Sequence, residues 1–262
     1  MGALEAILLG LLQGLTEFLP VSSSGHLVVA QHFLGITLPG VTFEVMVHFG
    51  TLLSIVWVFR KDLYHLIAHF TDQMEEKKLL ILLIIGTIPT GLMGLFFSSF
   101  FREIFDKPFI AGLMLLITGF IIIAIQKINV GNKGIKEMSP WDAALVGVFQ
   151  GIAIIPGITR SGSTILGALW RGLKREEAIR FSFLLALPAI AGASFLELMD
   201  LYKSGDLVNG FLSYTFWGAL TAFLSGIFAI NVFIKLLMKE KFYYLAYYCW
   251  LAGILTLLFA GS

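Results

Sequence analysis

The chain has 262 residues, of which 58% are hydrophobic and only 13% are charged. A soluble globular domain carries about 25% charged residues, so the composition excludes an ordinary soluble fold and indicates a polytopic membrane protein. The formal net charge of +1 comes without a basic arm or patch, so we expect no nucleic-acid partner, and the single Cys249 excludes an internal disulfide.

The first predicted element is a broken helix near the N-terminus. Residues 1–5 lack the positive region of a cleaved signal peptide, so we expect them in the mature protein. The apolar run 3–19 meets Pro20, and the next run, 27–38, is too short to cross a bilayer, which takes about 20 residues. We therefore predict a re-entrant hairpin over 3–38, whose polar turn must be buried in protein or line a wet cavity.

A second copy of this hairpin follows three predicted spans. These spans are 41–59, 79–98 and 109–126. Residues 142–172 repeat 5–35 at a constant shift of 137 positions without a gap. The second copy shares the following residues with the first: Ala143, Leu145, Gly147, Gln150, Gly151, Ser161, Gly162 and Gly172. It is interrupted at Pro156, which predicts another re-entrant hairpin over 141–172. Three more spans are predicted at 181–199, 211–236 and 243–260.

Lysine and arginine gather in four of the connections. These are 60–78, 127–139, 171–180 and 235–241. The other connections hold only Arg102, Lys107 and Lys203. By the positive-inside rule the four basic connections are cytoplasmic, and both termini lie outside.

The number of spans between the two copies sets their relative orientation. Three is odd, so the second hairpin is inverted and the two tips can meet inside the membrane. We therefore predict an all-α polytopic membrane protein with an inverted-topology repeat, two re-entrant helical hairpins and about six transmembrane helices. The two repeats, 1–126 and 140–262, form one integrated membrane domain.

The predicted tips carry side chains suited to an oxyanion. The hydroxyls after Pro20 and Pro156 can cap new half-helices, whose N-termini attract anions. Arg160 lies at membrane depth and needs a partner or ligand there, and its planar guanidinium suits phosphate. Glu17 is its natural counterpart, and Gln13 shares the face of Glu17 one turn earlier.

Phosphoryl transfer needs positioning and charge neutralisation, which these residues can supply. Ser23 or His26 could attack phosphorus, and His26 or Glu17 could move protons. Structural roles stay open beside these. Gln13 and Gln150 could pair across the repeats, and Glu17 with Arg160 could be a purely structural ion pair. The shared glycines favour close helix packing.

At these residues the chain resembles the undecaprenyl-diphosphate phosphatase family, also known as the bacitracin-resistance family. The family's first motif, (E/Q)-x-x-x-E followed by P-V-S-S-x-G-H, is matched by 13–17 and 20–26. Its second motif, P-G-x-S-R-S-G-x-T, is matched by 156–164, and 42–45 is also similar. Two positions depart from the usual pattern: Gln13 replaces a frequent Glu, and Thr159 replaces Ser.

The resemblance implies an enzyme that removes the terminal phosphate of a C55 polyprenyl diphosphate and so recycles the lipid carrier of the cell wall. It implies an outward-facing site in the inner (plasma) membrane, a divalent cation (Mg²⁺ or Ca²⁺) with Glu17 as its ligand, and is compatible with a homodimer. The predicted catalytic residues are Glu17, Ser23, His26 and Arg160. The predicted substrate-binding residues are Gln13, Ser24, Gly25, Thr159, Ser161, Gly162 and Thr164.

The rival hypothesis is a secondary transporter or flippase for a lipid phosphate, because inverted repeats with broken helices are transporter architecture. The presence of Ser23 and His26 beside Glu17 and Arg160 argues against pure transport, which needs no nucleophile. Glu44 and His48 share a face of the first full span and could support the site. We expect the tyrosines near the C-terminus to anchor the chain at the membrane interface, namely Tyr243, Tyr244, Tyr247 and Tyr248.

Overall fold

The computed structural model describes residues 2–34, 41–69, 74–105, 107–204, 214–239 and 242–259, and the named elements in these ranges are all helices. The helices are α1 Ala3–Phe18, α2 Ser23–Leu34, α3 Val41–Val58, α4 Arg60–Ala68, α5 Met74–Phe96, α6 Ser98–Phe105, α7 Pro108–Lys127, η1 Ile135–Glu137, α8 Pro140–Ile152, α9 Arg160–Trp170, α10 Arg175–Ser204, α11 Tyr214–Met238 and α12 Tyr244–Phe259. The predicted all-α membrane fold is confirmed.

The predicted spans coincide with helices. In the described ranges, α5, α7, α10 and α11 are long and apolar enough to cross a membrane, and α12 is a shorter apolar helix. The α3–α4 pair, bent by 72°, makes a fifth span if it is counted as one. Residues 211–213 and 260, at the ends of two predicted spans, lie outside the described residues, as do 35–38 of the first hairpin. The short helices α4 and α6 were not predicted.

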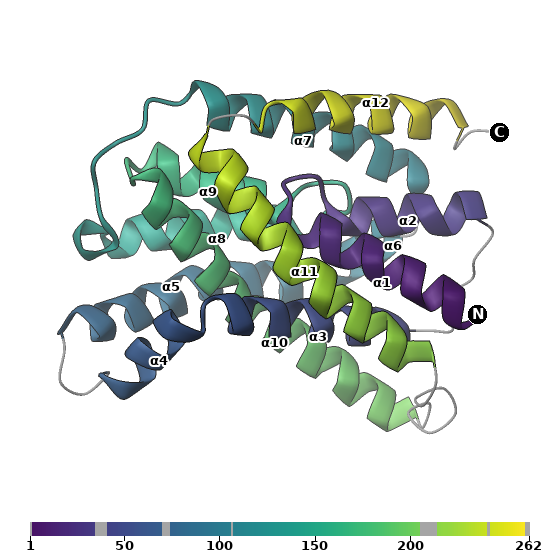
Figure 1. Ribbon diagram of the computed structural model, residues 1–262, viewed down its shortest axis with the longest axis horizontal. Coiled ribbons are helices and arrows are strands. Elements are labelled where there is room, and N and C mark those ends of the chain that lie inside the picture. The colour runs from purple at the N-terminus through teal and green to yellow at the C-terminus, as the bar shows by residue number, and fades with distance from the viewer. Residues whose placement is uncertain are drawn as a thin grey trace.

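Both broken helices are hairpins that return to the end from which they start. In Figure 1, α1 runs from the N-terminal end of the molecule to its middle, and α2 runs back. Helices α8 and α9 do the same from the opposite end, so that the turns 19–22 and 153–159 lie in the middle. The re-entrant geometry predicted from the repeat therefore agrees with the structure.

The basic connections gather at one end of the molecule. Helix α4, the segment 128–139 and the turn 171–174 all lie toward the left of Figure 1, whereas the two termini lie at the right. Arg180 of α10 pairs there with Asp62 of α4 at 2.6 Å. Lys241 of the predicted cluster 235–241 lies outside the described residues. The basic connections and the two termini therefore lie at opposite ends of the molecule.

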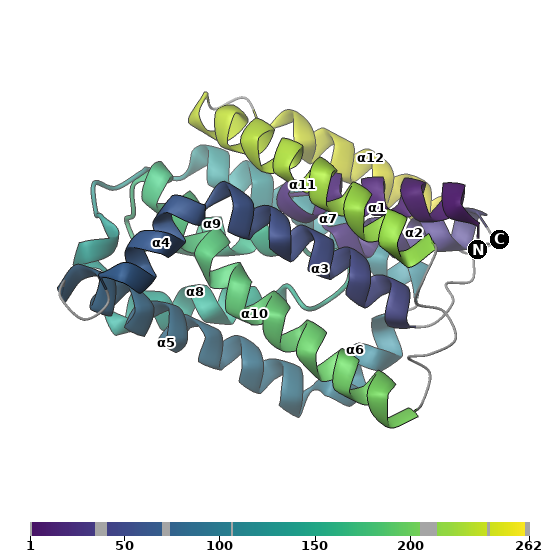
Figure 2. The same ribbon diagram turned by 60° about the horizontal axis from the view of Figure 1, so that its bottom comes forward.

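Helix contacts also come in pairs that suit an inverted repeat. Helix α1 packs on α11 and α8 packs on α5, while α3 contacts α11 and α10 contacts α5. Figure 2 shows α10 running between α3 and α5. These pairings support two equivalent halves; the division at 1–126 and 140–262 stays a prediction.

Glycines at equivalent positions allow the closest of these contacts. A Cβ on Gly10 would lie 2.2 Å from the carbonyl oxygen of Gly218, and one on Gly147 would lie 2.0 Å from that of Gly86. Real Cβ atoms do not approach backbone oxygens so closely. The prediction that these glycines serve close helix packing is therefore confirmed, at α1–α11 and α8–α5 respectively.

The start of the second hairpin is tied down by Asp142, which is fully buried. It pairs with Lys133 and, at 2.6 Å, with Arg171, and its carboxylate accepts the Ser139 backbone N–H at 2.8 Å. Burial by itself would raise the pKa of Asp142, but the hydrogen bonds from Lys133, Ser139 and Arg171 outweigh it and hold that pKa well below its usual range. These contacts join both ends of the hairpin to the loop before it.

Candidate active site

The first tip is built around Ser22, between α1 and α2. Ser22 has φ +69°, a left-handed conformation that is uncommon for a residue other than glycine. In this position its hydroxyl oxygen accepts the N–H of Gly25 at 3.4 Å and, from the second tip, the N–H of Gly157 at 3.1 Å. One serine therefore caps α2 and joins the two tips.

The second tip is held by Thr159 and Thr118. The Thr159 hydroxyl oxygen caps α9 by accepting the N–H of Gly162 at 3.2 Å. Thr118 of α7 accepts the Thr159 N–H at 3.0 Å and donates its hydroxyl to the carbonyl oxygen of Gly157 at 2.7 Å. Gly157 has φ +95°, which glycine adopts without strain. The N-terminal ends of α2 and α9, the positive ends of their dipoles, are thus fixed at the point where the tips meet.

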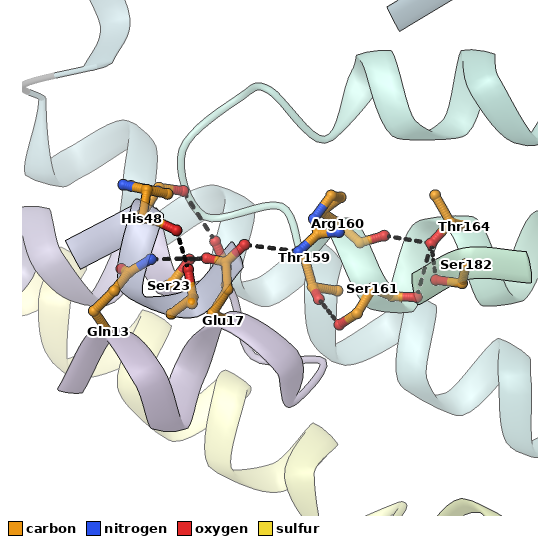
Figure 3. A network of polar contacts seen from close by, with 12 residues as sticks. Gln13, Glu17, Ser23, His48, Thr159, Arg160, Ser161, Thr164 and Ser182 are labelled. Carbon is orange, nitrogen blue, oxygen red and sulfur yellow. Dashed lines mark hydrogen bonds and ion pairs between the residues drawn. The ribbon is translucent and has the colours of Figure 1, made fainter. Parts of the chain in front are cut away.

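Glu17 is the centre of the site. Its Oε1 accepts a hydrogen bond from Arg160 Nη2 at 2.7 Å, and its Oε2 accepts one from the Ser23 hydroxyl at 2.5 Å and one from Gln13 Nε2 at 3.0 Å. Figure 3 shows these side chains converging from α1, α2 and the start of α9. The structure therefore brings three of the predicted site residues to the carboxylate of a fourth.

This arrangement places a hydroxyl, a group that can act as a nucleophile, beside a carboxylate, a group that can act as a base. A hydroxyl whose proton points at a carboxylate 2.5 Å away can be activated for attack. Among the bonds made within the described residues, Arg160 uses only Nη2, so its other N–H donors are available to an anion. Its side chain is 15% exposed and that of Glu17 only 7%, so the pair is largely shielded from solvent.

His26 is held on a different side of α2. Its Nδ1 lies 2.7 Å from the carbonyl oxygen of Ser22, and its Nε2 lies 2.7 Å from the hydroxyl of Tyr248 on α12. The described contacts of His26 do not include Glu17, Ser23 or Arg160. Ser23 points to Glu17, whereas His26 points to Tyr248.

The remaining hydroxyls of the second tip support its backbone. Thr164 is fully buried, bonds to Ser182 of α10 at 2.5 Å and donates to the carbonyl oxygen of Arg160 at 3.0 Å. Ser161 is buried beside Thr159, with 3.3 Å between their hydroxyl oxygens. In Figure 3, Thr164 and Ser182 lie on the far side of Arg160 from Glu17. Their hydroxyls therefore position Arg160, and substrate binding by them stays a prediction.

The suggested pairing of Gln13 with Gln150 is wrong. Gln13 donates to Glu17, whereas Gln150 donates to the hydroxyl of Thr90 on α5 at 3.2 Å. The two amides lie on hairpins that meet at their tips, and each finds its partner on its own side of that junction.

His48 of α3 is drawn beside the Glu17 network in Figure 3, and its Nδ1 lies 2.8 Å from the backbone carbonyl oxygen of Glu44. Glu44 and His48 were both predicted to support the site. Ser24 lies in the first tip, where its hydroxyl oxygen is 3.4 Å from that of Ser22.

Comparison with known proteins assigns the chain to a family. Residues 6–255 match the model of the bacitracin resistance protein BacA family. The chain belongs to this family. It is similar to an undecaprenyl-diphosphatase of Alkaliphilus metalliredigens, with 44% identity over 99% of both chains. Proteins of the same description from Halothermothrix orenii and Syntrophotalea carbinolica are each 45% identical, over 98% and 97% of both chains.

The donor set gives little support to a resident metal ion of the kind that family resemblance implies. The described residues contain no group of three or more His, Cys, Asp or Glu side chains that could hold a metal ion. Both oxygens of Glu17 already accept hydrogen bonds from Arg160, Ser23 and Gln13. Gln13 Oε1 is buried without a hydrogen-bond partner, but a neutral amide oxygen is a poor substitute for a second carboxylate. A resident cation does not fit these donors.

Proposed function

We propose that this chain is an integral membrane phosphatase that hydrolyses undecaprenyl diphosphate to the monophosphate and inorganic phosphate, and so recycles the cell-wall lipid carrier. The observation that carries the proposal is the contact of Ser23 and Arg160 with opposite oxygens of Glu17. Membership of the family and the full-length similarity to proteins described as undecaprenyl-diphosphatase support the substrate.

The geometry suits attack on a terminal phosphorus. The free donors of Arg160 hold the terminal phosphate oxygens, and Glu17 accepts the proton of Ser23 as its oxygen attacks. The P–O bond between the two phosphates breaks, and the lipid monophosphate leaves with the proton that Glu17 gives up. Water then attacks the phosphoserine and passes a proton to the regenerated Glu17 carboxylate; the bond between the Ser23 oxygen and phosphorus breaks, phosphate leaves, and Glu17 returns the proton to Ser23. A water molecule that replaces Ser23 as the attacking group would use the same base.

Phosphate release by the purified protein tests the proposal. With undecaprenyl diphosphate in detergent micelles, we expect steady release by the wild type and almost none by Glu17→Ala and Arg160→Ala. Gln150→Ala is the matched control. Gln150 is the equivalent of Gln13 in the second hairpin, but it donates to Thr90 and not to Glu17. Absence of release by a folded wild-type protein refutes the enzyme, and lipid transfer across proteoliposomes then favours the flippase.

A pure transporter is the weaker candidate on this geometry. Anion binding would require Arg160 and the helix N-termini, but not a hydroxyl that donates to a carboxylate. The short contact between Ser23 and Glu17 is the feature that transport alone leaves unexplained.

The orientation of the protein in the membrane is also a proposal. We place both termini and the active site outside, and the four basic connections in the cytoplasm, on the strength of the charge asymmetry. Asn132 and Lys203 are exposed at opposite ends, and the native Cys249 is buried and so should react little. A membrane-impermeant thiol reagent on intact cells should label Lys203→Cys and spare Asn132→Cys; the reverse pattern refutes this orientation.

A divalent cation and a homodimer complete the proposal. A cation would arrive with the diphosphate and be held by the phosphate oxygens, since both oxygens of Glu17 already accept hydrogen bonds from Arg160, Ser23 and Gln13. Activity measured against Mg²⁺ or Ca²⁺ in the presence of a chelator tests this.

The dimer has only the family resemblance as support, and light scattering of the detergent-solubilised protein decides it.

A further inference from the structure

The imidazole ring of His26 is held at both nitrogens. The carbonyl oxygen of Ser22 lies 2.7 Å from Nδ1, and the hydroxyl of Tyr248 lies 2.7 Å from Nε2. The two rings also stack, with centroids 5.5 Å apart and planes inclined by 10°. His26 is buried, whereas Tyr248 is 45% exposed.

These contacts define the proton positions on the neutral ring. A carbonyl oxygen can only accept, so Nδ1 carries the proton and donates it to Ser22. Nε2 then has a free lone pair, to which the Tyr248 hydroxyl donates. A tyrosine hydroxyl can also accept, so the same contact persists when His26 is protonated. Tyr248 therefore suits both protonation states without a movement of the ring.

Tyr248 is held firmly enough to act in this way. Helix α12 lies against α7, where a Cβ on Gly253 would come within 2.8 Å of the carbonyl oxygen of Gly112. Trp250, two residues after Tyr248, donates its Nε1 to the carbonyl oxygen of Leu116 at 3.1 Å. The same helix α7 carries Thr118, which fixes the second tip. Helix α7 thus sets the position of Tyr248 relative to the active site.

We propose that Tyr248 is a positioning residue for His26, whose ring it orients and whose Nδ1–H tautomer it stabilises through its hydroxyl. The sequence had suggested only a membrane-interface anchor at this position. The proposal rests on the phosphatase function and on the prediction that His26 is one of its catalytic residues. It predicts that Tyr248 affects turnover only through His26.

A double-mutant cycle tests this dependence. Tyr248→Phe keeps the stacked ring and removes the hydroxyl, and we expect kcat to fall about five- to tenfold, as for the loss of one hydrogen bond, with KM unchanged. In a His26→Ala background the same change should have no further effect. Tyr247→Phe is the matched control: it removes the hydroxyl of the neighbouring tyrosine, whose ring packs against Trp250, and should leave kcat unaltered. Equal losses from Tyr248→Phe in both backgrounds would refute the proposal.

A chemical readout separates this proposal from the phosphatase function. The lone pair of an unprotonated imidazole nitrogen attacks diethyl pyrocarbonate, and mass spectrometry locates the modified residue. We expect His26 to react faster in Tyr248→Phe than in the wild type, while His65 reacts equally in both. An unchanged rate at His26 overturns the contact. If His26 reacts faster in Tyr248→Phe but the wild type releases no phosphate, the contact stands and only the enzyme is refuted.

Discussion

Glutamine at position 17 would remove one charge and leave the size of the side chain nearly unchanged. Glu17 accepts hydrogen bonds from Arg160, Ser23 and Gln13 within 2.5–3.0 Å. A glutamine oxygen can still accept from one of these groups, but the amide cannot take the proton of Ser23. A positioned general base contributes about 10²–10⁴-fold to turnover, so we expect kcat of Glu17→Gln to fall by about three orders of magnitude.

The substrate affinity should respond in a different way. Glu17 occupies one donor of Arg160, which is only 15% exposed, and neutralises its charge. Without that counter-charge the guanidinium attracts the diphosphate at least as strongly, so KM of Glu17→Gln should stay level or fall. Arg160→Ala should instead raise KM, because it removes the cation that binds phosphate. The stability of Glu17→Gln should decrease by less than the roughly 3–5 kcal/mol typical of a broken buried pair, since the amide retains a hydrogen bond.

Phosphate release over a range of undecaprenyl diphosphate concentrations, on protein shown to be monodisperse by size exclusion, measures both constants. Ser23→Ala and the double variant complete the experiment. If Glu17 acts on Ser23, the double variant should be no slower than Ser23→Ala alone. A kcat for Glu17→Gln within tenfold of the wild type, or a loss confined to KM, would show that Glu17 is not the base.

Other predictions concern the fold and its tips. Gly147→Ala should destabilise the protein by about 1–3 kcal/mol through overpacking, because its Cβ would meet the carbonyl oxygen of Gly86. Gly192→Ala should not destabilise it, because a Cβ at Gly192 has nothing within 4 Å. Thermal unfolding of the two variants checks this. Ser22→Ala removes the acceptor for Gly25 and Gly157 and should cost about 1–2 kcal/mol and much of the activity, and an equal effect of Ser24→Ala would contradict the cross-tip role. Because the pKa of Asp142 is lowered in the folded protein, its ion pairs stabilise the fold above the unfolded pKa of about 3.9, and this stabilisation is lost as the pH falls below that value. Wild-type stability should therefore decline in acid, while Asp142→Asn, less stable at pH 7, should decline less. Parallel pH–stability curves of the two proteins would refute the ion-pair role.

The sequence predicted the architecture because three independent patterns agree on it. Apolar length indicates the spans, Lys and Arg indicate the two ends, and the repeat requires the hairpins to be equivalent. Helices α4 and α6 escaped prediction because each is too short to span. For α10, the charged residues from Arg175 to Arg180 masked the first turns of a helix whose apolar part begins at Phe181.

The site was predicted in part, and the success depended on sequence distance. Glu17, Ser23 and Gln13 lie within one hairpin, and Arg160 is an intramembrane charge that needs a partner, so their meeting could be inferred. The contact between His26 and Tyr248 joins residues 222 positions apart. No repeat, charge or spacing signals it, since a tyrosine near a membrane boundary has an ordinary role as an anchor.

The repeat also explains how one fold gives an asymmetric site. The shift of 137 positions matches Ser22 with Thr159, and both hydroxyls cap the N–H three residues later, at Gly25 and Gly162. The next residue of each half-helix is then Ser23 in one copy and Arg160 in the other, so equivalent backbone positions present a hydroxyl and a cation.

The carboxylate that joins them exists in only one copy, because the position matching Glu17 is Ile154. Two carboxylates at the tips would repel each other and compete for a single guanidinium. One Glu17 is sufficient, since its two oxygens face the first residues of both half-helices, at 2.5 Å and 2.7 Å. The duplicated backbone therefore supplies two capped helix starts at equivalent positions. A different residue at the first position of each helix gives one copy a hydroxyl and the other a cation.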